Sequence, residues 1–495
     1  MPKPLWTAEL RSQVMQGLGW KAFSQISVQV MALVTTIFIA HLLTPSEVGV
    51  VAMATVFSAL ALILSDLALG AALVQRETLT EEDRSSAFWL NVGFGLLLTL
   101  AGVALAGPIA NLYGEPEVEP LFQVISITFL LSALGTTQNA LLIRDMRFRS
   151  LEVRTVVSTG LGGAMAIALA IAGAGPWAIV GQKLTVNATS TVLVWRASRW
   201  RPRILVSLAS LRHLVNFSGW LVGARLLSYV NANADNYLIG RYVGSAGLGA
   251  YSIAYNVMLV PLTRLASPVQ QVFYPALSKI REPVGVGKAW LHATKLVALF
   301  TLPAFAGMAV VAPDFVRVVL GEQWDASVRV IQILCWVGIV GAVVSQVVAV
   351  LQALDRTAWG FRFTVVATVV TITAFAIGVQ WGIVGVAVAS AIASTLLAPY
   401  YLSLPLRATG VRPLRFLGAI AGVVQASVVM AVSLFALRSL ALDSLSPALR
   451  LAILIAAGLA IYLPLVAWRE PDALKEVRRL LRDRRESDEE GALVS

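Results

Sequence analysis

The sequence predicts an all-α polytopic membrane protein of about fourteen transmembrane helices, arranged as two parallel six-helix lobes followed by two C-terminal helices. Three observations predict this class. The 495 residues are 58% hydrophobic and only 13% charged, with a mean hydropathy of +0.78, which lies outside the range of soluble globular proteins. The Lys and Arg residues are concentrated in every second gap between the apolar stretches. The first half of the chain also shares a sequence pattern with the second.

The apolar stretches are each long enough to cross a bilayer as a helix. In order they are residues 18–41, 46–72, 86–112, 118–142, 150–173, 175–196, 212–240, 245–275, 288–311, 325–353, 358–379, 383–405, 413–437 and 448–468. Thr44-Pro45-Ser46-Glu47, between the first two, predicts a capped helix start. The predicted organisation is a cytoplasmic tail, an N-lobe, a C-lobe, a helix pair and a charged cytoplasmic tail, at residues 1–17, 18–200, 212–405, 413–468 and 469–495.

The 38 Lys and Arg residues are distributed unevenly over the two sides of the membrane. One side, formed by both tails and the even-numbered loops, holds 30 of them, whereas the odd-numbered loops hold five: Arg241, Arg317, Arg329, Arg438 and Arg450. Cationic loops are retained in the cytoplasm. The pattern therefore predicts a multi-pass protein of the bacterial inner membrane with both termini cytoplasmic. It also explains the net charge of +11 without nucleic acid as a partner.

An internal repeat relates the two lobes. A shift of 200 residues places Gly19-Trp20 on Gly219-Trp220 and Gly49 on Gly249. Because each copy has six helices, both copies enter the membrane from the same side, so the lobes are related by an axis along the membrane normal. Repeats of this kind commonly enclose a binding site between them.

Once the charged residues assigned to the loops and helix ends are set aside, five remain inside the predicted spans: Asp66, Lys183, Arg225, Asp235 and Arg264. Each costs about 2.5–3.5 kcal/mol at mid-membrane on insertion scales, so each needs a cavity or a partner. Ion pairing between helices, or snorkelling near a helix end, is the alternative explanation. Asp66, Arg225 and Arg264 fall in the cytoplasmic half of their spans, where an anionic ligand could enter from the cytoplasm.

Polar side chains on the first helix of each lobe extend this candidate cavity. The stretch 212–240 carries Asn231 and Asn233, and its repeat partner 18–41 carries Gln25. We find no phosphate-binding loop, no Ser/His/Asp arrangement and a single cysteine, Cys335. The sequence therefore predicts no catalytic residue, no metal and no cofactor, which favours a transporter over an enzyme.

Several segments carry a further, more specific pattern. They include Ala40-His-Leu-Leu-Thr-Pro-Ser-Glu-Val-Gly49, Leu73-Val-Gln-Arg76, Arg144-Asp-Met-Arg-Phe148, Asn236-Tyr-Leu-Ile-Gly-Arg241 and Phe273-Tyr-Pro-Ala-Leu-Ser278. Together they resemble the bacterial polysaccharide flippases of the multidrug/oligosaccharidyl-lipid/polysaccharide (MOP) exporter superfamily. The resemblance is collinear over residues 15–405, and the region beyond is compatible with it.

The resemblance implies fourteen helices and an alternately accessible cavity. The cargo would be an undecaprenyl-diphosphate-linked oligosaccharide, moved from the cytoplasmic to the periplasmic leaflet for lipopolysaccharide or exopolysaccharide biosynthesis. Arg225, Arg264 and Lys183 would supply cations for the diphosphate, and guanidinium geometry favours the two arginines. Gln25, Asn231 and Asn233 would meet the sugars.

Two other functions are alternatives to this one. A multidrug exporter of the same superfamily would favour a cavity dominated by acids and only twelve helices. A membrane polysaccharide polymerase or ligase would need a sizeable periplasmic loop, and the predicted outer loops are short. The expected partners are the lipid-linked oligosaccharide, membrane lipid, and pathway proteins such as a polysaccharide polymerase.

Overall fold

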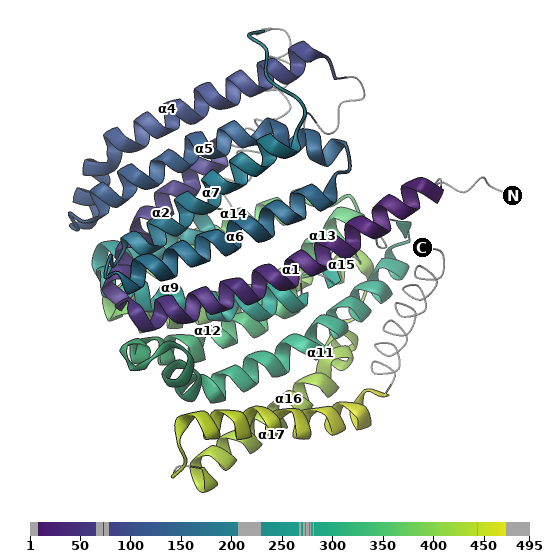
Figure 1. Cartoon of the computed structure of the whole chain (residues 1–495). Coiled ribbons are helices and arrows are strands. Elements are labelled where there is room, and N and C mark those ends of the chain that lie inside the picture. The colour runs from purple at the N-terminus through teal and green to yellow at the C-terminus, as the bar shows by residue number, and fades with distance from the viewer. Residues whose placement is uncertain are drawn as a thin grey trace, which may run out of the picture. The chain divides into compact units, whose positions relative to one another are not determined.

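The computed structural model describes residues 8–65, 73, 79–205, 229–266, 269–270, 273, 277, 279–280, 282–442 and 444–471, with side chains from residue 19 onwards except at 22 and 61–65. Every regular element in these residues is a helix, and they contain no strand (Figure 1). The chain forms two compact units, residues 1–249 and 250–495. We call them the first and the second unit.

The first unit is built around a row of antiparallel helices. Its helices are α1 (Ala8–Leu42), α2 (Pro45–Ser65), α4 (Glu81–Tyr113), α5 (Val118–Arg144), α6 (Phe148–Ile171), α7 (Trp177–Ala197) and a helical segment at 229–242. In the row, α4 packs on α5, α5 on α7, α7 on α6 and α6 on α1, while α2 packs against α5 and α4. Figure 1 shows the row from α4 to α1.

The start of α2 confirms the predicted helix cap. The Glu47 carboxylate accepts hydrogen bonds from the backbone N–H of Thr44 at 2.7 Å and from its hydroxyl at 2.9 Å. The Thr44 hydroxyl oxygen in turn accepts the backbone N–H of Glu47. A second cap of this type, which the sequence analysis missed, joins Thr80 and Asp83 at the start of α4. Both caps satisfy backbone donors that the first helical turn leaves unpaired.

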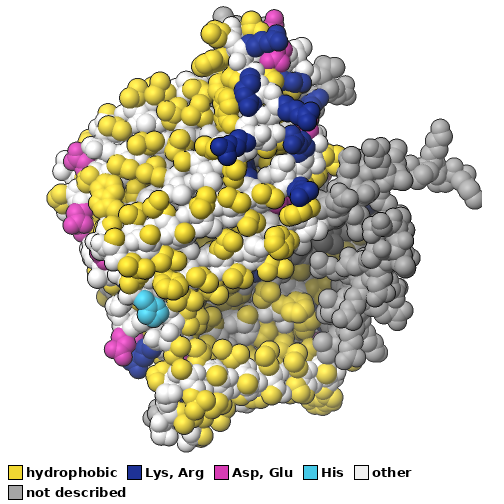
Figure 2. Space-filling view, viewed as in Figure 1, with side chains coloured by type: hydrophobic (Ala, Val, Ile, Leu, Met, Phe, Trp, Pro, Cys, Tyr) yellow, Lys and Arg dark blue, Asp and Glu magenta, His cyan; other side chains and the backbone are white. Residues whose placement is uncertain are grey.

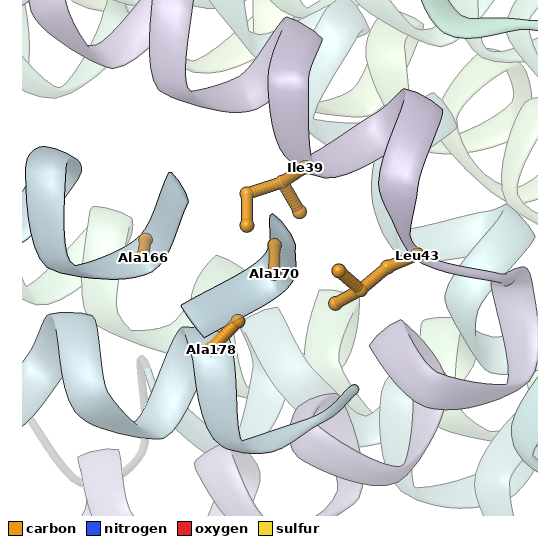
Figure 3. Close-up of a cluster of buried hydrophobic side chains, with 5 residues drawn as sticks. All are labelled: Ile39, Leu43, Ala166, Ala170 and Ala178. Atoms are coloured by element: carbon orange, nitrogen blue, oxygen red, sulfur yellow. The ribbon is translucent and has the colours of Figure 1, made fainter. Parts of the chain in front are cut away.

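Small side chains allow the helices of the row to approach closely. Ile39 of α1 and Leu43, which directly follows α1, pack against Ala166 and Ala170 of α6 and Ala178 of α7 (Figure 3). Hydrophobicity does not drive helices together inside a bilayer, because lipid tails are as apolar as the side chains. Association then depends on close packing, which alanine and glycine permit.

The second unit is centred on α11 (Pro283–Phe315). The other helices are α9 (Ser245–Pro261), which begins in the first unit, α12 (Asp325–Val344), α13 (Val347–Ala353), α14 (Thr357–Gly378), α15 (Gly382–Thr409), α16 (Pro413–Ala441) and α17 (Pro447–Arg469). Short π- and 3-10 turns join them: η1 (Leu262–Ala266), η2 (Val316–Leu320), η3 (Glu322–Trp324) and η4 (Val379–Trp381). α11 contacts α12, α16 and α17, and α15 packs against α14 and α12.

These helices confirm the predicted fold class. The described residues contain ten helical segments that are long and apolar enough to cross a membrane, and one of them, 357–409, includes both α14 and α15. Each of the fourteen predicted stretches lies at least in part on a helix. The count of fourteen transmembrane helices and the lobe boundaries remain predictions.

Basic side chains gather at one end of the first unit (Figure 2). At this end α4 and α6 begin and α5 and α7 end, and its cations are Arg84, Arg144, Arg147, Arg149, Arg154, Arg196, Arg199, Arg201 and Arg203. Glu115, Glu117 and Glu119 lie at the opposite end. In the second unit, basic residues likewise lie at the end where α11 and α16 begin and α17 ends. They are Lys288, Lys295, Arg412, Arg415 and Arg469. We call this the basic end of each unit.

The starts of α2 and α9 cross each other at backbone distance. A Cβ atom at Gly49 would overlap the carbonyl oxygen of Ser245, and one at Gly249 would overlap the carbonyl oxygen of the first residue of α2. The Ser245 hydroxyl donates to Glu115 Oε1 at 2.8 Å and lies 2.9 Å from the hydroxyl of Ser46, which is therefore the donor of that second bond. Gly49 and Gly249 are equivalent positions of the repeat, so the contact is reciprocal.

We expect Gly49→Ala to lower the thermal stability of the purified protein, because the added methyl group must push the two helices apart. Overpacking of this kind costs about 1–3 kcal/mol. Gly93→Ala is the matched control, because a Cβ on that α4 glycine meets no neighbouring atom and both substitutions bring the same gain in helix propensity. Equal melting temperatures for the two variants would contradict the close crossing.

Candidate functional site

The structure describes six of the eight predicted site residues, whereas Asp66 and Arg225 lie outside the described residues. The six fall in both units. The first unit contains Gln25, Lys183, Asn231, Asn233 and Asp235, and the second contains Arg264. Their convergence on one cavity therefore stays a prediction.

The helical segment 229–242 carries a buried polar face. The Asp235 side chain is only 4% exposed and accepts a hydrogen bond from the backbone N–H of Asn236 at 2.8 Å. Asn233 donates to the Tyr229 carbonyl oxygen at 3.1 Å, and the Tyr229 hydroxyl donates to a carbonyl oxygen of α2. The Oδ1 atom of Asn231 is buried without a hydrogen-bond partner among the described residues. This face thus gathers polar groups inside the first unit, and the Asn231 Oδ1 atom is an unused acceptor among the described residues.

A polar pocket of about 130 Å3 opens among α5, α6 and α7. Among the described residues that line it, Arg154 is the only charged one, and its Nη1 donates to Asn139 Oδ1 at 2.7 Å. The remaining lining residues are Ser132, Gly135, Thr136, Asn187, Ser190, Thr191 and Val194. Lys183 lies one helical turn before Asn187, on the same face of α7. The polar face of α7 that carries the predicted site residue Lys183 therefore continues through the pocket towards the basic end.

Arg154 is one of the 30 basic residues assigned above to the tails and even-numbered loops, and the sequence did not predict this pocket. The signal was present in the spacing of polar residues. Ser132, Thr136 and Asn139 recur at helical spacing along α5, which places them on one face. Only the packing of α5 on α7 shows that this face meets the one that carries Asn187.

Arg264 lies in η1, a five-residue π-helical turn that directly follows Pro261 at the end of α9. Its side chain is exposed, and so is Gln25 on α1. π-turns widen a helix locally and occur frequently at functional sites. An exposed guanidinium on such a turn is accessible to a ligand, and the role of Arg264 stays a prediction.

A second cavity, almost entirely apolar, lies between α11, α16 and α17 and has a volume of about 610 Å3. One wall is the α11 face that carries Pro303, Gly307 and Val311, and the opposite wall includes Leu434 of α16 and Gly458 of α17. The two glycines present no side chain to the groove, and a Cβ atom at either would lie in contact with Met430. Its volume lies in the range of small-molecule sites, and its walls suit a hydrocarbon ligand. We call it the apolar groove.

Ionic contacts tie the α16–α17 hairpin to α11 at both ends of the apolar groove. At one end, Asp314 of α11 contacts Arg450 of α17 at 2.6 Å and Arg438 of α16 at 3.1 Å. At the basic end, Lys295 of α11 forms an ion pair with Glu470. Between them, the Tyr462 hydroxyl donates to the Leu299 carbonyl oxygen at 2.6 Å. The groove therefore has fixed walls.

Sequence reasoning missed the apolar groove and its ion pairs. The predicted stretch 288–311 ends too early, because α11 continues to Phe315 and carries Asp314 inside the helix. Arg438 and Arg450 were predicted as outer-loop cations, but they lie within α16 and α17. The sequence did contain a signal for the ion pairs, because one apolar helix carries a carboxylate, Asp314, and two others each carry an arginine. Nothing in the sequence shows that those three helices are neighbours.

Comparison with known proteins identifies related chains. The sequence profile described as "Polysaccharide biosynthesis protein" matches residues 38–329. The lipopolysaccharide biosynthesis protein WzxC of Escherichia coli is 29% identical over 76% of this chain and 77% of its own length. The teichuronic acid biosynthesis protein TuaB of Bacillus subtilis is 28% identical over 70% of this chain and 72% of its own length.

Among solved structures, the lipid II flippase MurJ in an inward closed conformation matches with a TM-score of 0.72. The match covers 92% of this chain and 99% of that structure at 16% sequence identity. At this identity the similarity establishes a shared fold.

Proposed function

We propose that this chain, a member of the polysaccharide biosynthesis protein family, is a flippase for a lipid-linked oligosaccharide. It would move an undecaprenyl-diphosphate-linked glycan from the cytoplasmic to the periplasmic leaflet by alternating access, for lipopolysaccharide or exopolysaccharide biosynthesis. The observation that carries the proposal is the pairing of a hydrocarbon-lined groove with polar, cationic surfaces in one chain. The names of its relatives, a lipopolysaccharide and a teichuronic acid biosynthesis protein, support the same process.

The apolar groove fits the lipid part of such a cargo. A polyprenyl chain is long, flexible and without polar atoms, so it gains nothing from a polar site. The groove offers apolar walls on three helices and a volume of about 610 Å3. Transfer of a CH2 group from water to an apolar site is favourable by about 0.8 kcal/mol. A lipid chain that already lies in the bilayer does not gain this free energy when it enters the groove. The groove therefore orients the chain more than it raises affinity.

The polar part of the cargo needs different partners. We propose that Arg264 and Arg225 bind the diphosphate and that Asp66 holds one of them when the site is empty. Gln25, Asn231 and Asn233 would contact the sugars, and Lys183 and Asp235 would line the same cavity. Arginine suits this role because its planar guanidinium pairs with two phosphate oxygens at once.

The family membership and the named neighbours favour transport over catalysis. Within transport, the alternative is an exporter of multidrug type. A small soluble drug has no part that requires a long apolar groove beside a polar region, whereas a polyprenyl-linked glycan has both parts. We therefore prefer the lipid-linked cargo.

We propose that the basic end of each unit faces the cytoplasm and that both termini lie there. Cysteine labelling tests this orientation in a Cys335→Ala background, because Cys335 is the single cysteine and is buried. Both Arg201 and Glu117 are exposed. In intact spheroplasts a membrane-impermeant maleimide should label Glu117→Cys, and it should label Arg201→Cys only after permeabilisation. Labelling of Arg201→Cys in intact spheroplasts would reverse the orientation.

Filling the apolar groove tests the function most directly. Gly307 lines the groove, so Gly307→Phe should place a ring where the lipid chain lies and reduce glycan export about tenfold or more, an effect equal to at least about 1.4 kcal/mol. Gly418→Phe is the matched control, since Gly418 is exposed on α16 with no atom near its Cβ position. Export is measured in cells that lack the native gene, together with the amount of protein in the membrane. Normal export by Gly307→Phe would refute the role of the groove.

Replacing Arg264 tests the diphosphate site. Arg264→Ala should leave membrane abundance unchanged, because the side chain is exposed, but it should weaken cargo binding about ten- to a hundredfold, the effect of losing one charge-assisted contact. Arg264→Lys keeps the charge without the planar fork and should give an intermediate effect. Thr263→Ala, at the exposed neighbouring position, is the control. Normal export at normal abundance for Arg264→Ala would rule out this residue.

A further inference from the structure

The polar pocket of the first unit combines one cation with neutral hydrogen-bonding groups. The described residues that line it supply the guanidinium of Arg154, the amides of Asn139 and Asn187 and several hydroxyl groups, and none of these residues is an acid. The volume of about 130 Å3 is well below the roughly 300–1,000 Å3 of sites that enclose a drug-sized molecule. A water molecule takes up about 30 Å3 in the liquid, so a single small ion would leave most of the pocket empty. The pocket therefore has room for one ring-sized polar group.

Arg154 has hydrogen-bond donors that the described protein groups do not use. Its Nη1 donates to Asn139 Oδ1 at 2.7 Å, and its Nε is buried without a partner among the described residues. A guanidinium has five N–H donors, so most of them remain for a ligand. None of the ion pairs among the described residues includes Arg154. Glu152 acts on it electrostatically, but residues two apart on a helix do not face each other, and Glu152 is not among the described lining residues.

The neutral groups of the pocket are also only partly used. Asn139 accepts from Arg154 through its amide oxygen, which leaves the two N–H donors of this amide. Asn187 donates one N–H to a backbone carbonyl oxygen of its own helix at 2.9 Å and keeps its amide oxygen as an acceptor. Thr136 and Thr191 donate to backbone carbonyl oxygens at 3.0 and 2.7 Å, so their oxygen lone pairs remain. The pocket thus offers donors and acceptors around a single cation, which is the pattern that a hydroxylated anion requires.

The pocket lies close to the basic end of the first unit. Arg154 is the seventh residue of α6, which begins at this end, so it lies about 9 Å along the helix at about 1.5 Å per residue. In the orientation proposed above, this depth is on the cytoplasmic side, where the cargo is loaded. A charged side chain facing lipid inside a bilayer is costly. The pocket therefore contains water or a polar ligand.

We propose that this pocket binds one sugar residue that carries a carboxylate, such as a hexuronic acid, in the glycan of the cargo. The inference rests on the proposed function and deepens it, because it makes the transported glycan an acidic one. The carboxylate accepts two parallel N–H groups from Arg154, and the ring hydroxyls bond to Asn139, Asn187 and the hydroxyl groups of the pocket. The polar walls do not suit a hydrocarbon chain, and the volume limits the site to a single sugar ring.

Saturation-transfer NMR with free sugars tests the site on the purified full-length protein in phosphatidylcholine nanodiscs. D-glucuronate should bind at least about tenfold more tightly than D-glucose, which has a similar ring without the charge. Arg154→Gln should weaken glucuronate binding about ten- to a hundredfold, the effect of losing one charge-assisted contact, and should leave glucose binding unchanged. Arg199→Gln is the matched control, because it removes an exposed arginine from the same basic end that does not line the pocket. Its affinity for glucuronate should equal that of the wild type.

A second variant keeps the contact between Arg154 and Asn139. Ser190 lines the pocket, so Ser190→Leu should fill the space of the sugar ring with an apolar side chain and weaken glucuronate binding about tenfold or more. If Arg154→Gln does not fold, Ser190→Leu decides the test. Wild-type affinity for glucuronate in Ser190→Leu would then refute the site.

The remaining outcomes separate an acidic sugar from other anions. Equal affinity of the wild type for glucuronate and glucose would overturn the proposal, and so would unchanged glucuronate binding in Arg154→Gln. Acetate or inorganic phosphate that binds as tightly as glucuronate would reduce the pocket to a site for any small oxyanion. Loss of glucuronate binding in phosphatidylglycerol nanodiscs would assign it to lipid headgroups and equally overturn the proposal. Each of these results leaves the proposed function standing, because Gly307→Phe and Arg264→Ala test that function independently.

Discussion

A hydrocarbon interior does not tolerate an unpaired charge, and this constraint determines where nearly every ionic group of the chain lies. Because of it, most cations lie near helix ends and in loops, at the basic end of each unit. It also explains why Asp314, at 1% side-chain exposure, is contacted by two arginines from two other helices. Removing one partner of such a buried pair leaves an uncompensated charge, which is far more destabilising than the pair is stabilising.

The same constraint separates the two kinds of binding surface. Polar side chains line a pocket in the first unit, on α5, α6 and α7, while the apolar groove lies in the second unit on α11, α16 and α17. The α16–α17 hairpin follows the predicted repeat and supplies two of the three walls of that groove. An appended helix pair thereby gives the chain an apolar groove that the duplicated helices alone would lack.

The sequence predicted the fold class well because hydropathy and loop charge are local properties. The apolar stretches, the cap at Thr44 and the clustering of cations at one end all follow from residues close to one another in the chain. The site was less predictable. Lys183 and Asp235 were recognised as unusual within an apolar span, yet Arg154 and Asp314 were missed because each lies near a helix end, where a charge needs no explanation. Their importance arises from neighbours on other helices, such as Asn139 and Arg450, and such contacts depend on packing that no local pattern reveals.

The crossing of α2 and α9 resembles the interface of a symmetric homodimer, in which residue i of one copy meets residue j of the other and j meets i. In a homodimer every substitution is introduced twice, so the two halves of the contact cannot differ. Here both copies belong to one chain, and they have diverged: Ser245 donates a hydrogen bond to Glu115, whereas its repeat equivalent is Pro45, which has no hydroxyl group. Because both copies are encoded in one gene, each can be substituted independently of the other. Each half of the crossing can therefore carry a polar contact that the other half lacks.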